Sequence, residues 1–314
     1  MAENRNAQQV REITDKLEQG LKELFESERF KEYLKTMSKF YNYSFNNTLL
    51  IAMQKPDATL IAGYTAWQRN FDRHVMKGEK GIKILAPAPY KVQEEREKLD
   101  PATQKPVLDK DGKPVTETVE VTRPAFKVVS VFDVSQTDGK ELPDIAVDEL
   151  TGSVENYAAF FDALKELSPV PIAFENITDG AKGYFSHVEN RIAIQEGMSE
   201  IQTIKTAIHE IAHAKLHAVT PGEKVAPEDK KDRRTKEVEA ESVAYTVCQR
   251  YGIETSDYSF GYIAGWSSDK ETKELKGSLE TIRKTAAEMI TGIDEKLKER
   301  LAVKEQEAPT PLRG

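Results

Sequence analysis

Residues 204–217 read IKTAIHEIAHAKLH, and this stretch decides the fold of the second half of the chain. It contains His209, Glu210 and His213 at the spacing H-E-x-x-H. On a helix, residues four apart lie on the same face, so both imidazoles can reach one metal ion at about 2.0–2.1 Å. The apolar residues around them predict a buried helix over 200–218. Polar groups on a buried helix are costly unless they are paired or bind a metal.

The same motif supplies a candidate catalytic group. Glu210 lies next to the first histidine, close enough to hold a water molecule on the metal and to accept its proton. A site of this kind takes two histidines and one carboxylate, with water in the fourth position. We therefore predict one Zn²⁺ per chain, with His209 and His213 as two of its ligands and Glu210 as the general base.

A second helix, predicted over residues 236–251, offers the third ligand. Glu237 and Glu241 lie four residues apart on one face of it, followed by small and apolar residues that can pack against the first helix. We assign Glu237 as the ligand and expect Glu241 to hydrogen-bond a ligand histidine. The reverse assignment stays open. Glu239 points to another side of the helix and is the weaker candidate.

Other interpretations of this cluster also stay open. A buried H-E-x-x-H segment can be a hydrogen-bonded core feature without metal, and a metal site can lack catalytic activity. His217 follows His213 by four residues and is an alternative ligand. Cys248 lies two turns beyond Glu241, too far for the same ion, and is expected to be a plain buried residue.

Composition limits the class of protein. The chain has 314 residues, enough for about two domains. Cys248 is the one cysteine, which excludes an intramolecular disulfide and a Cys-rich zinc ribbon. The net charge of −8 argues against a uniformly basic DNA coat but permits a local basic groove. No stretch is apolar enough for a signal peptide or a membrane span, so we expect a cytoplasmic protein without a membrane partner.

The pattern along the chain predicts an α+β protein of two domains. The first covers residues 1–137, and a polar linker, 138–150, joins it to the second, 151–302, before a flexible tail, 303–314. In the first domain we predict helices and then strands; these are helices at 8–36, 44–54 and 65–71, and strands at 81–87 and 125–134. The charged insertion at about 92–122 is predicted to be an exposed hairpin or a partly disordered excursion. The remaining elements of the second domain are helices at 154–167 and 270–301 and short strands at 171–174, 183–187 and 191–195.

A basic, aromatic stretch stands out in the first domain. Residues 40–91 hold seven Lys or Arg against three Asp or Glu, a local net charge of +4. Cations that follow phosphates and rings that stack on bases are typical of single-stranded nucleic-acid binding. The alternative is a small aromatic core with a solvated basic rim. The candidate contacts are Asn46, Asn47, Tyr64, Trp67, Arg69, Arg73, Lys77, Lys80 and Lys83.

Spaced motifs in this region resemble the N-terminal single-stranded-DNA-binding domain of the ArdC antirestriction proteins. They are Y-S-x-N-N-x-L-L-I-x-x-Q-x-P-x-A (43–58), G-Y-x-x-W (63–67), V-x-K-G-E-K-G-I-x-I-L-A-P (75–87) and V-F-D-V-S-Q-T (131–137). That family carries a zincin-like metallopeptidase domain behind this module, and the second domain also resembles the ImmA/IrrE metallopeptidases. The resemblance covers residues 8–255 and departs in the insertion at 92–122 and in the C-terminal helix.

The resemblance implies a fold and a role. It implies a small sheet packed on the H-E-x-x-H and glutamate helices, with a strand of the 183–194 hairpin running antiparallel to the substrate. Tyr184 or His187 would then lie near the cleft, although either can be an ordinary hairpin residue. The implied role is antirestriction or DNA protection during conjugative transfer of a mobile element, with single-stranded DNA and an unknown peptide or protein as partners. Two alternatives are a DNA-binding accessory protein with a non-catalytic metal site and an ImmA-type peptidase that cleaves a regulator.

Overall fold

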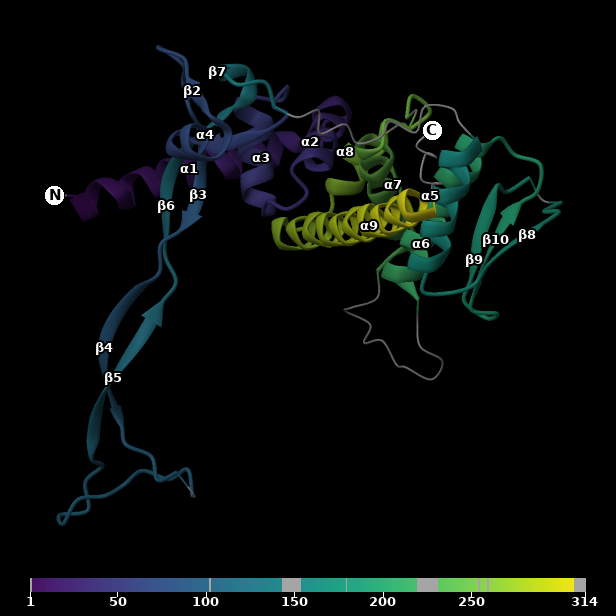
Figure 1. Ribbon diagram of the computed structural model, residues 1–314. Coiled ribbons are helices and arrows are strands. Elements are labelled where there is room, and N and C mark those ends of the chain that lie inside the picture. The colour runs from purple at the N-terminus through teal and green to yellow at the C-terminus, as the bar shows by residue number, and fades with distance from the viewer. Residues whose placement is uncertain are drawn as a thin grey trace.

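The computed structural model describes residues 2–101, 103–142, 154–178, 180–218, 231–253, 255–258 and 260–307. Within these residues the chain is an α+β protein with several small sheets, as predicted (Figure 1). Most of the predicted linker, and residues 308–314 of the predicted tail, lie outside the described part. No helix in the described ranges is long and apolar enough to cross a membrane.

The chain begins with two helices where one was predicted over residues 8–36. α1 (Ala2–Leu24) and α2 (Ser27–Lys39) are separated at Glu26, whose backbone is extended (φ −80°, ψ 136°). The break brings the buried rings of Phe25 and Phe30 together, with centroids 6.2 Å apart. The single-helix prediction was wrong because two short helices in succession show the same apolar spacing as one long helix.

A three-stranded antiparallel sheet forms the centre of the first half. Its order is β1 (Ile61–Gly63), β6 (Phe126–Asp133), β3 (Ile82–Pro87), which confirms the two predicted strands. Helices α3 (Phe45–Gln54) and α4 (Tyr64–Phe71) pack against it. A short ribbon of β2 (Arg73–Val75) and β7 (Thr137–Gly139) lies beside it. A small apolar core lies between the sheet and α3, and its members are Phe40, Ile51, Ala58, Ile61, Ile82, Ile84 and Val131.

Asp133 ends β6 and ties the sheet to the loop before β1. Its buried carboxylate accepts hydrogen bonds from the backbone N–H groups of Thr59 (2.7 Å), Leu60 (3.1 Å) and Ser135 (3.0 Å). The side chain of Gln136 accepts in return from the backbone N–H of Asp133, which completes a capping box on the 3-10 turn η1 (Val134–Gln136). The V-F-D-V-S-Q-T motif therefore has a structural role: it links the end of β6 to the loop before β1.

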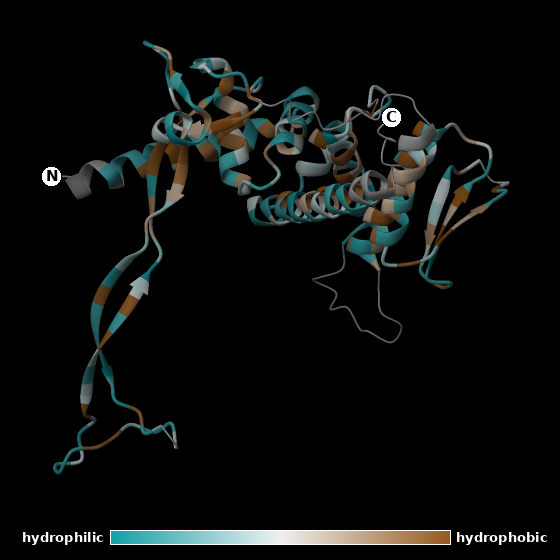
Figure 2. Ribbon diagram, in the orientation of Figure 1, coloured by the Kyte–Doolittle hydropathy of each residue, from teal (hydrophilic) through white to brown (hydrophobic). Residues whose placement is uncertain are grey.

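The charged insertion forms the hairpin that was one of its two predicted states. β4 (Tyr90–Glu97) and β5 (Thr116–Arg123) pair antiparallel over their full length, and Figure 1 shows the pair projecting from the sheet as a long arm. Figure 2 shows few apolar positions along it. A lone two-stranded ribbon buries little surface, so its stability comes from the ladder and from cross-strand pairs such as Val92 with Val121.

A second small sheet lies at the far end of the molecule (Figure 1). Its order is β8 (Ile172–Glu175), β10 (Arg191–Gln195), β9 (Gly183–Ser186), with β8 parallel and β9 antiparallel to the central strand. β9 is an edge strand, and it contacts α6 (Glu200–His217). α6 packs in turn against α7 (Arg233–Arg250), and α5 (Val154–Leu167) lies alongside. α8 (Ile263–Ser267) and the long α9 (Thr272–Glu307) complete the fold, and α9 runs into the segment predicted as a tail.

The helices of both predicted domains share one apolar core. Phe25 packs edge-on against Trp266 (centroids 5.8 Å apart) and Phe30 against Phe260 (5.1 Å). These contacts join the junction of α1 and α2 to α8 and to the residues just before it. Arg283 on α9 also donates to the backbone carbonyls of Tyr41 and Tyr43. The division at residue 137 stays a prediction. α2 packs on α3 in the first half and also contacts α7 in the second.

Candidate metal centre

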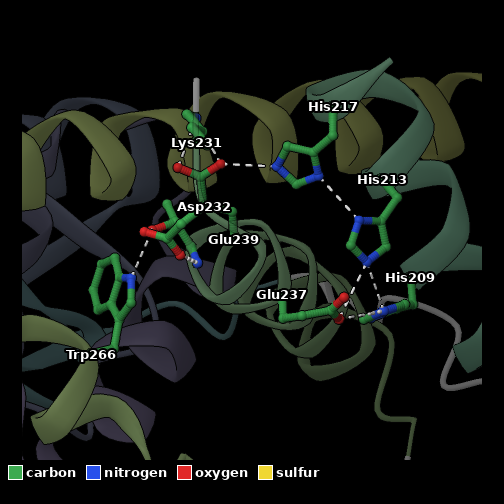
Figure 3. Close-up of polar contacts among 9 residues, drawn as sticks. His209, His213, His217, Lys231, Asp232, Glu237, Glu239 and Trp266 are labelled. Atoms are coloured by element: carbon green, nitrogen blue, oxygen red, sulfur yellow. Dashed lines mark hydrogen bonds and ion pairs between the residues drawn. The ribbon is translucent and has the colours of Figure 1, made fainter. Parts of the chain in front are cut away.

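Three side chains from two packed helices converge at one point. His209 and His213 lie one turn apart on α6, and Glu237 faces them from α7 (Figure 3). The Nε2 atoms of the two histidines are 3.1 Å apart, and Oε2 of Glu237 lies 3.7 Å from the first and 3.5 Å from the second. The structure therefore brings together the three residues that the spacing predicted as ligands.

These separations fit a zinc ion. Four ligand atoms placed tetrahedrally at about 2.0–2.1 Å from one ion lie roughly 3.3–3.4 Å from each other. The three separations between His209, His213 and Glu237 bracket that value. Two imidazoles and one carboxylate are also the donor set of catalytic zinc sites that leave one position open.

Local packing explains why the histidines reach this point. Ser199 caps α6, since its side chain accepts from the backbone N–H of Gln202, and the helix is buried around the motif. Gly183 lets β9 approach closely. A Cβ at Gly183 would meet Thr206 at 2.6 Å and the backbone oxygen of Ala193 at 2.9 Å, so only glycine allows the edge strand to lie against α6 here.

Glu210 has the environment of a proton acceptor. It is buried (8% exposed), it lies beside His209, and it lines two cavities. Burial raises the pKa of its carboxyl, and the neighbouring histidines partly oppose that rise. The same histidines, which hydrogen-bond Glu237, hold the pKa of Glu237 well below its usual range. The pKa values of the two carboxyl groups beside the histidines are therefore shifted in opposite directions.

Behind the cluster, His217, Glu239 and Lys231 form a connected row of polar side chains, called the polar line below. This row was not predicted from the sequence. Nδ1 of His213 lies 3.1 Å from Nδ1 of His217, and Nε2 of His217 lies 3.1 Å from Glu239, which is fully buried (Figure 3). Lys231 donates to both carboxylate oxygens of Glu239, at 2.7 and 2.8 Å. Burial lowers the pKa of His217 even though Glu239 opposes this. His217, the alternative ligand, contacts the far side of His213 and lies outside the cluster of three.

The predicted role of Glu241 is corrected by the structure. Its carboxylate accepts a hydrogen bond from the hydroxyl of Tyr262, and the described contacts include no hydrogen bond from it to a histidine. Burial raises its pKa. The carboxylate that supports a histidine is Glu239, the residue that seemed to point away. The helix pair is rotated so that Glu239 faces the line behind the metal cluster and Glu241 faces a cavity.

Two cavities flank the motif. One, of about 360 Å³, lies between α6 and the chain after α7, where Lys205, Glu241 and Tyr258 contribute to its wall. The other, of about 630 Å³, lies between β9 and the start of α7, where His187 and Lys236 contribute to its wall. Gly183, His209 and Glu210 line both, so the two cavities meet at the candidate metal position.

The hairpin residues Tyr184 and His187 both line the larger cavity, but they differ in what else they contact. The hydroxyl of Tyr184 donates to Glu175 and also lies 3.3 Å from a nitrogen of Arg191, which fixes it within the small sheet. His187 packs on Phe185 and has its pKa lowered by burial. Of the two, His187 has the side chain without a hydrogen bond among the described contacts.

Two side-chain amides of α3, Asn47 and Gln54, hydrogen-bond the backbone of β3. Asn47 donates to the backbone oxygen of Leu85 and accepts from its N–H, both at 2.9 Å. Gln54 makes the same pair of bonds with Lys83, again at 2.9 Å. The two amides act as a substitute strand that satisfies the outer edge of β3. Both ends of the Asn47 amide are thus used within the fold, and its role as a DNA contact stays a prediction.

Two further predicted contacts are built into the fold. The ring of Trp67 is fully buried, and its Nε1–H donates to the backbone oxygen of Phe132 at 2.9 Å. The guanidinium of Arg73 donates to Thr137 (2.8 Å to Oγ1 and 2.9 Å to the backbone oxygen) and to the backbone oxygen of Lys140 at 2.6 Å. The ring of Trp67 is therefore part of the core, and the guanidinium of Arg73 holds β7 and the residue after it. Their roles as DNA contacts stay predictions.

The other predicted contacts remain on the surface. Tyr64 is 59% exposed, with its ring edge-on to Phe132. The exposed polar and cationic candidates are Asn46, Arg69, Lys77, Lys80 and Lys83. Lys83 donates to Ser130 at 2.6 Å and stays solvent-exposed. The surface around the first sheet therefore keeps four cations and one aromatic ring of the predicted set.

Comparison with known protein families matches both halves of the chain. Residues 4–132 match the family described as the N-terminal domain of anti-restriction factor ArdC. Residues 168–251 match the IrrE N-terminal-like domain of a peptidase family, and that range includes all three members of the metal cluster.

Relatives in curated collections are longer than this chain. A Bacillus anthracis protein, pXO2-81, is 29% identical over 93% of this chain, which spans 52% of that protein. Escherichia coli DNA primase TraC is 34% identical over 44% of this chain but only 12% of its own length. Two solved structures of the antirestriction protein ArdC from plasmid R388 are also similar. The metal-free form has 22% identity and a TM-score of 0.48 (83% of this chain, 86% of that one), and the Mn(II)-bound form has 20% and 0.45 (83% and 85%).

Proposed function

We propose, on the premise that this chain is an ArdC-like antirestriction protein with an IrrE-like peptidase domain, that it binds single-stranded DNA and hydrolyses peptides with a zinc ion. The family match to an anti-restriction factor and the DNA primase among its relatives support a role with DNA during the transfer of a mobile element, where antirestriction protects the incoming strand. Its peptide substrate would be a protein met during that process.

The arrangement of His209, His213 and Glu237 beside Glu210 carries the peptidase proposal. The cluster lies where two cavities meet, next to the edge strand β9. An exposed strand edge offers unpaired backbone groups to which an extended peptide can add as a further strand. A peptide held there would place a backbone carbonyl near the metal position and near Glu210.

The chemistry divides between the ion and the protein. A zinc ion held by the three ligands would act as a Lewis acid toward a peptide carbonyl and would acidify water. Glu210 would accept the proton of the attacking water, and burial of its carboxyl favours this by raising its pKa. It could then deliver that proton to the leaving nitrogen, because β9 and α6 hold it beside the cleft.

The metal and the base can be tested separately. We expect purified protein to contain about one zinc per chain by elemental analysis, and His209→Ala to lose it. Glu210→Gln should keep the metal and slow cleavage of a lysate-derived peptide library by at least about 100-fold. If the wild type binds no metal, the proposed site is wrong. If antirestriction survives intact in Glu210→Gln, the protein acts as a DNA-binding accessory whose metal site is not catalytic.

Exposed cations around the first sheet support the DNA-binding part. Arg69, Lys77 and Lys80 have no ion-pair partner among the described contacts, and each lies on the surface. Binding of a labelled single-stranded oligonucleotide should weaken steeply with salt, and the triple change of these residues to Ala should reduce the salt slope. Unchanged affinity in that variant would contradict the proposed surface.

A further inference from the structure

The larger cavity beside the metal cluster has a basic wall. Three cations from the first turn of α7 and the segment just before it contribute to that wall: Lys231, Arg233 and Lys236. They lie beside Glu237, so a group bound next to them would be close to the candidate metal position. The cavity volume of about 630 Å³ is large enough for several side chains of a bound peptide.

Two of these cations are paired with no carboxylate in the part of the chain that the structure describes. Lys231 is held by Glu239. Among the described residues, Arg233 and Lys236 make no side-chain hydrogen bond or ion pair. The nearby carboxylate of Asp232 is already used, because it accepts from the backbone N–H of Thr235 and pairs with Lys270.

The cavity on the other side of His209 differs in charge. It also contains two lysines, but Lys205 is paired with Asp257, and Lys182 donates to Gln202 at 3.0 Å. Glu241 adds a further carboxylate to its wall. Lys182 therefore has only a neutral partner, but Asp257 and Glu241 give this cavity two carboxylates. Among the described residues, the α7 side is where two cations lie together without a hydrogen-bond or ion-pair partner.

We propose that the cleft selects peptides that carry an acidic side chain, Asp or Glu, which pairs with Arg233 and Lys236 beside the cleaved bond. This inference rests on the peptidase function proposed above. A peptide carboxylate fits these observations better than a nucleic acid, because two free cations match one or two negative charges. A chain of phosphates carries more negative charge than one side-chain carboxylate, so Glu210 and Glu237 would repel it more strongly at this point.

The test compares the wild type with a charge-reversed variant, Arg233→Glu with Lys236→Glu. A matched control, Lys276→Glu with Lys298→Glu, changes the same charge at exposed sites on α9 that do not line the cleft. Each protein is first assayed for zinc content and then given a lysate-derived peptide library, with half of the peptides amidated at the C-terminus. Cleaved sequences are aligned on the broken bond.

We expect Asp or Glu to be enriched at one fixed position near the bond, equally in amidated and free peptides, for the wild type and the control. The reversed variant should lose about tenfold in relative cleavage of those sequences and should favour Lys or Arg there. Cleavage without acidic enrichment, or enrichment confined to a free C-terminal carboxylate, would overturn this inference and leave the peptidase proposal standing. No cleavage by any protein would overturn both.

Binding supplies a readout independent of turnover. In the Glu210→Gln background, a fluorescent copy of the best cleaved peptide should bind about tenfold more tightly than its Glu→Gln analogue, and reversal of Arg233 and Lys236 should remove that difference. An equal affinity for the two peptides contradicts the inference. So does a result in which reversal weakens binding of single-stranded DNA and leaves peptide selection unchanged.

Discussion

Nδ1 of His213 lies 3.1 Å from Nδ1 of His217, and this contact fixes which nitrogen of His213 is free for a metal. Nε2–H of His217 donates to the ionised carboxylate of Glu239, so Nδ1 of a neutral His217 is an acceptor. His213 must then carry its proton on Nδ1, which leaves the lone pair of Nε2 directed at His209 and Glu237. The polar line behind the cluster therefore selects the metal-binding tautomer.

We predict that loss of this line weakens metal binding. Glu239→Gln and His217→Ala should each lower zinc affinity by about 10–100-fold, because the orientation and basicity of His213 would no longer be fixed. Competition with a chromophoric chelator measures this directly. Glu241→Gln is the matched control on the same helix, since Glu241 contacts Tyr262 and not the line. Wild-type affinity in both variants of the line would contradict this assignment.

A second prediction concerns the amide clamp on β3. Asn47→Asp changes little in size but replaces an N–H donor by a carboxylate oxygen facing the backbone oxygen of Leu85. We expect it to lower the free energy of unfolding by about 1–3 kcal/mol, the cost of an unsatisfied buried group. Gln54→Glu should act in the same direction at Lys83 but with a smaller loss, because that pair is exposed to solvent. Urea denaturation is the measurement, and Asn46→Asp, exposed on the same helix, should leave stability nearly unchanged.

The amides and glutamates show where sequence reasoning stops. The H-E-x-x-H spacing put His209 and His213 on one face of a helix, as the structure has them, because helix periodicity is a local property. The hydrogen-bond partner of Asn47 is Leu85, which lies 38 positions further along the chain, and no local sequence pattern predicts that contact. Glu241 was expected to hydrogen-bond a histidine, but Glu239 does so. The sequence could not distinguish them, because tertiary packing sets the rotation of α7 against α6. A third histidine at the same spacing, His217, was the available signal for the polar line.

In the first half of the chain, contacts between distant residues also decided which aromatic ring is buried. The two rings were predicted alike from composition, but Trp67 entered the core and Tyr64 stayed on the surface. Indole can bury its ring only if its N–H finds an acceptor, and the backbone oxygen of Phe132 supplies one. That acceptor is 65 residues away, so the partition could not be seen from the motif G-Y-x-x-W alone.

A third prediction is a pH dependence of stability centred on Asp133. Burial works to raise the pKa of this carboxyl, but hydrogen bonds from Thr59 and from Ser135 outweigh it and lower the pKa below its usual value. A depressed folded-state pKa contributes stability above the unfolded value of about 3.9, and that stability is lost as the pH falls through the folded pKa. Asp133→Asn should thus be destabilising near neutral pH, by about 1–3 kcal/mol. The difference in the free energy of unfolding between this variant and the wild type should become smaller as the pH falls below about 4. A difference that stays constant with pH in urea titrations would contradict this prediction.

The last prediction separates the two aromatic residues by function. Tyr64→Ala should weaken binding of a single-stranded oligonucleotide by about 1–3 kcal/mol, the usual value of one stacked base, and should leave the free energy of unfolding nearly unchanged because the ring is 59% exposed. Trp67→Phe should show the opposite profile. It removes the N–H that Phe132 accepts and leaves space in a core where the side chain is fully buried, so stability should fall by about 1–3 kcal/mol. For both variants, fluorescence anisotropy at fixed salt measures the affinity for the oligonucleotide, and urea denaturation measures the free energy of unfolding. Loss of DNA affinity in folded Trp67→Phe together with wild-type affinity in Tyr64→Ala would move the binding surface away from Tyr64.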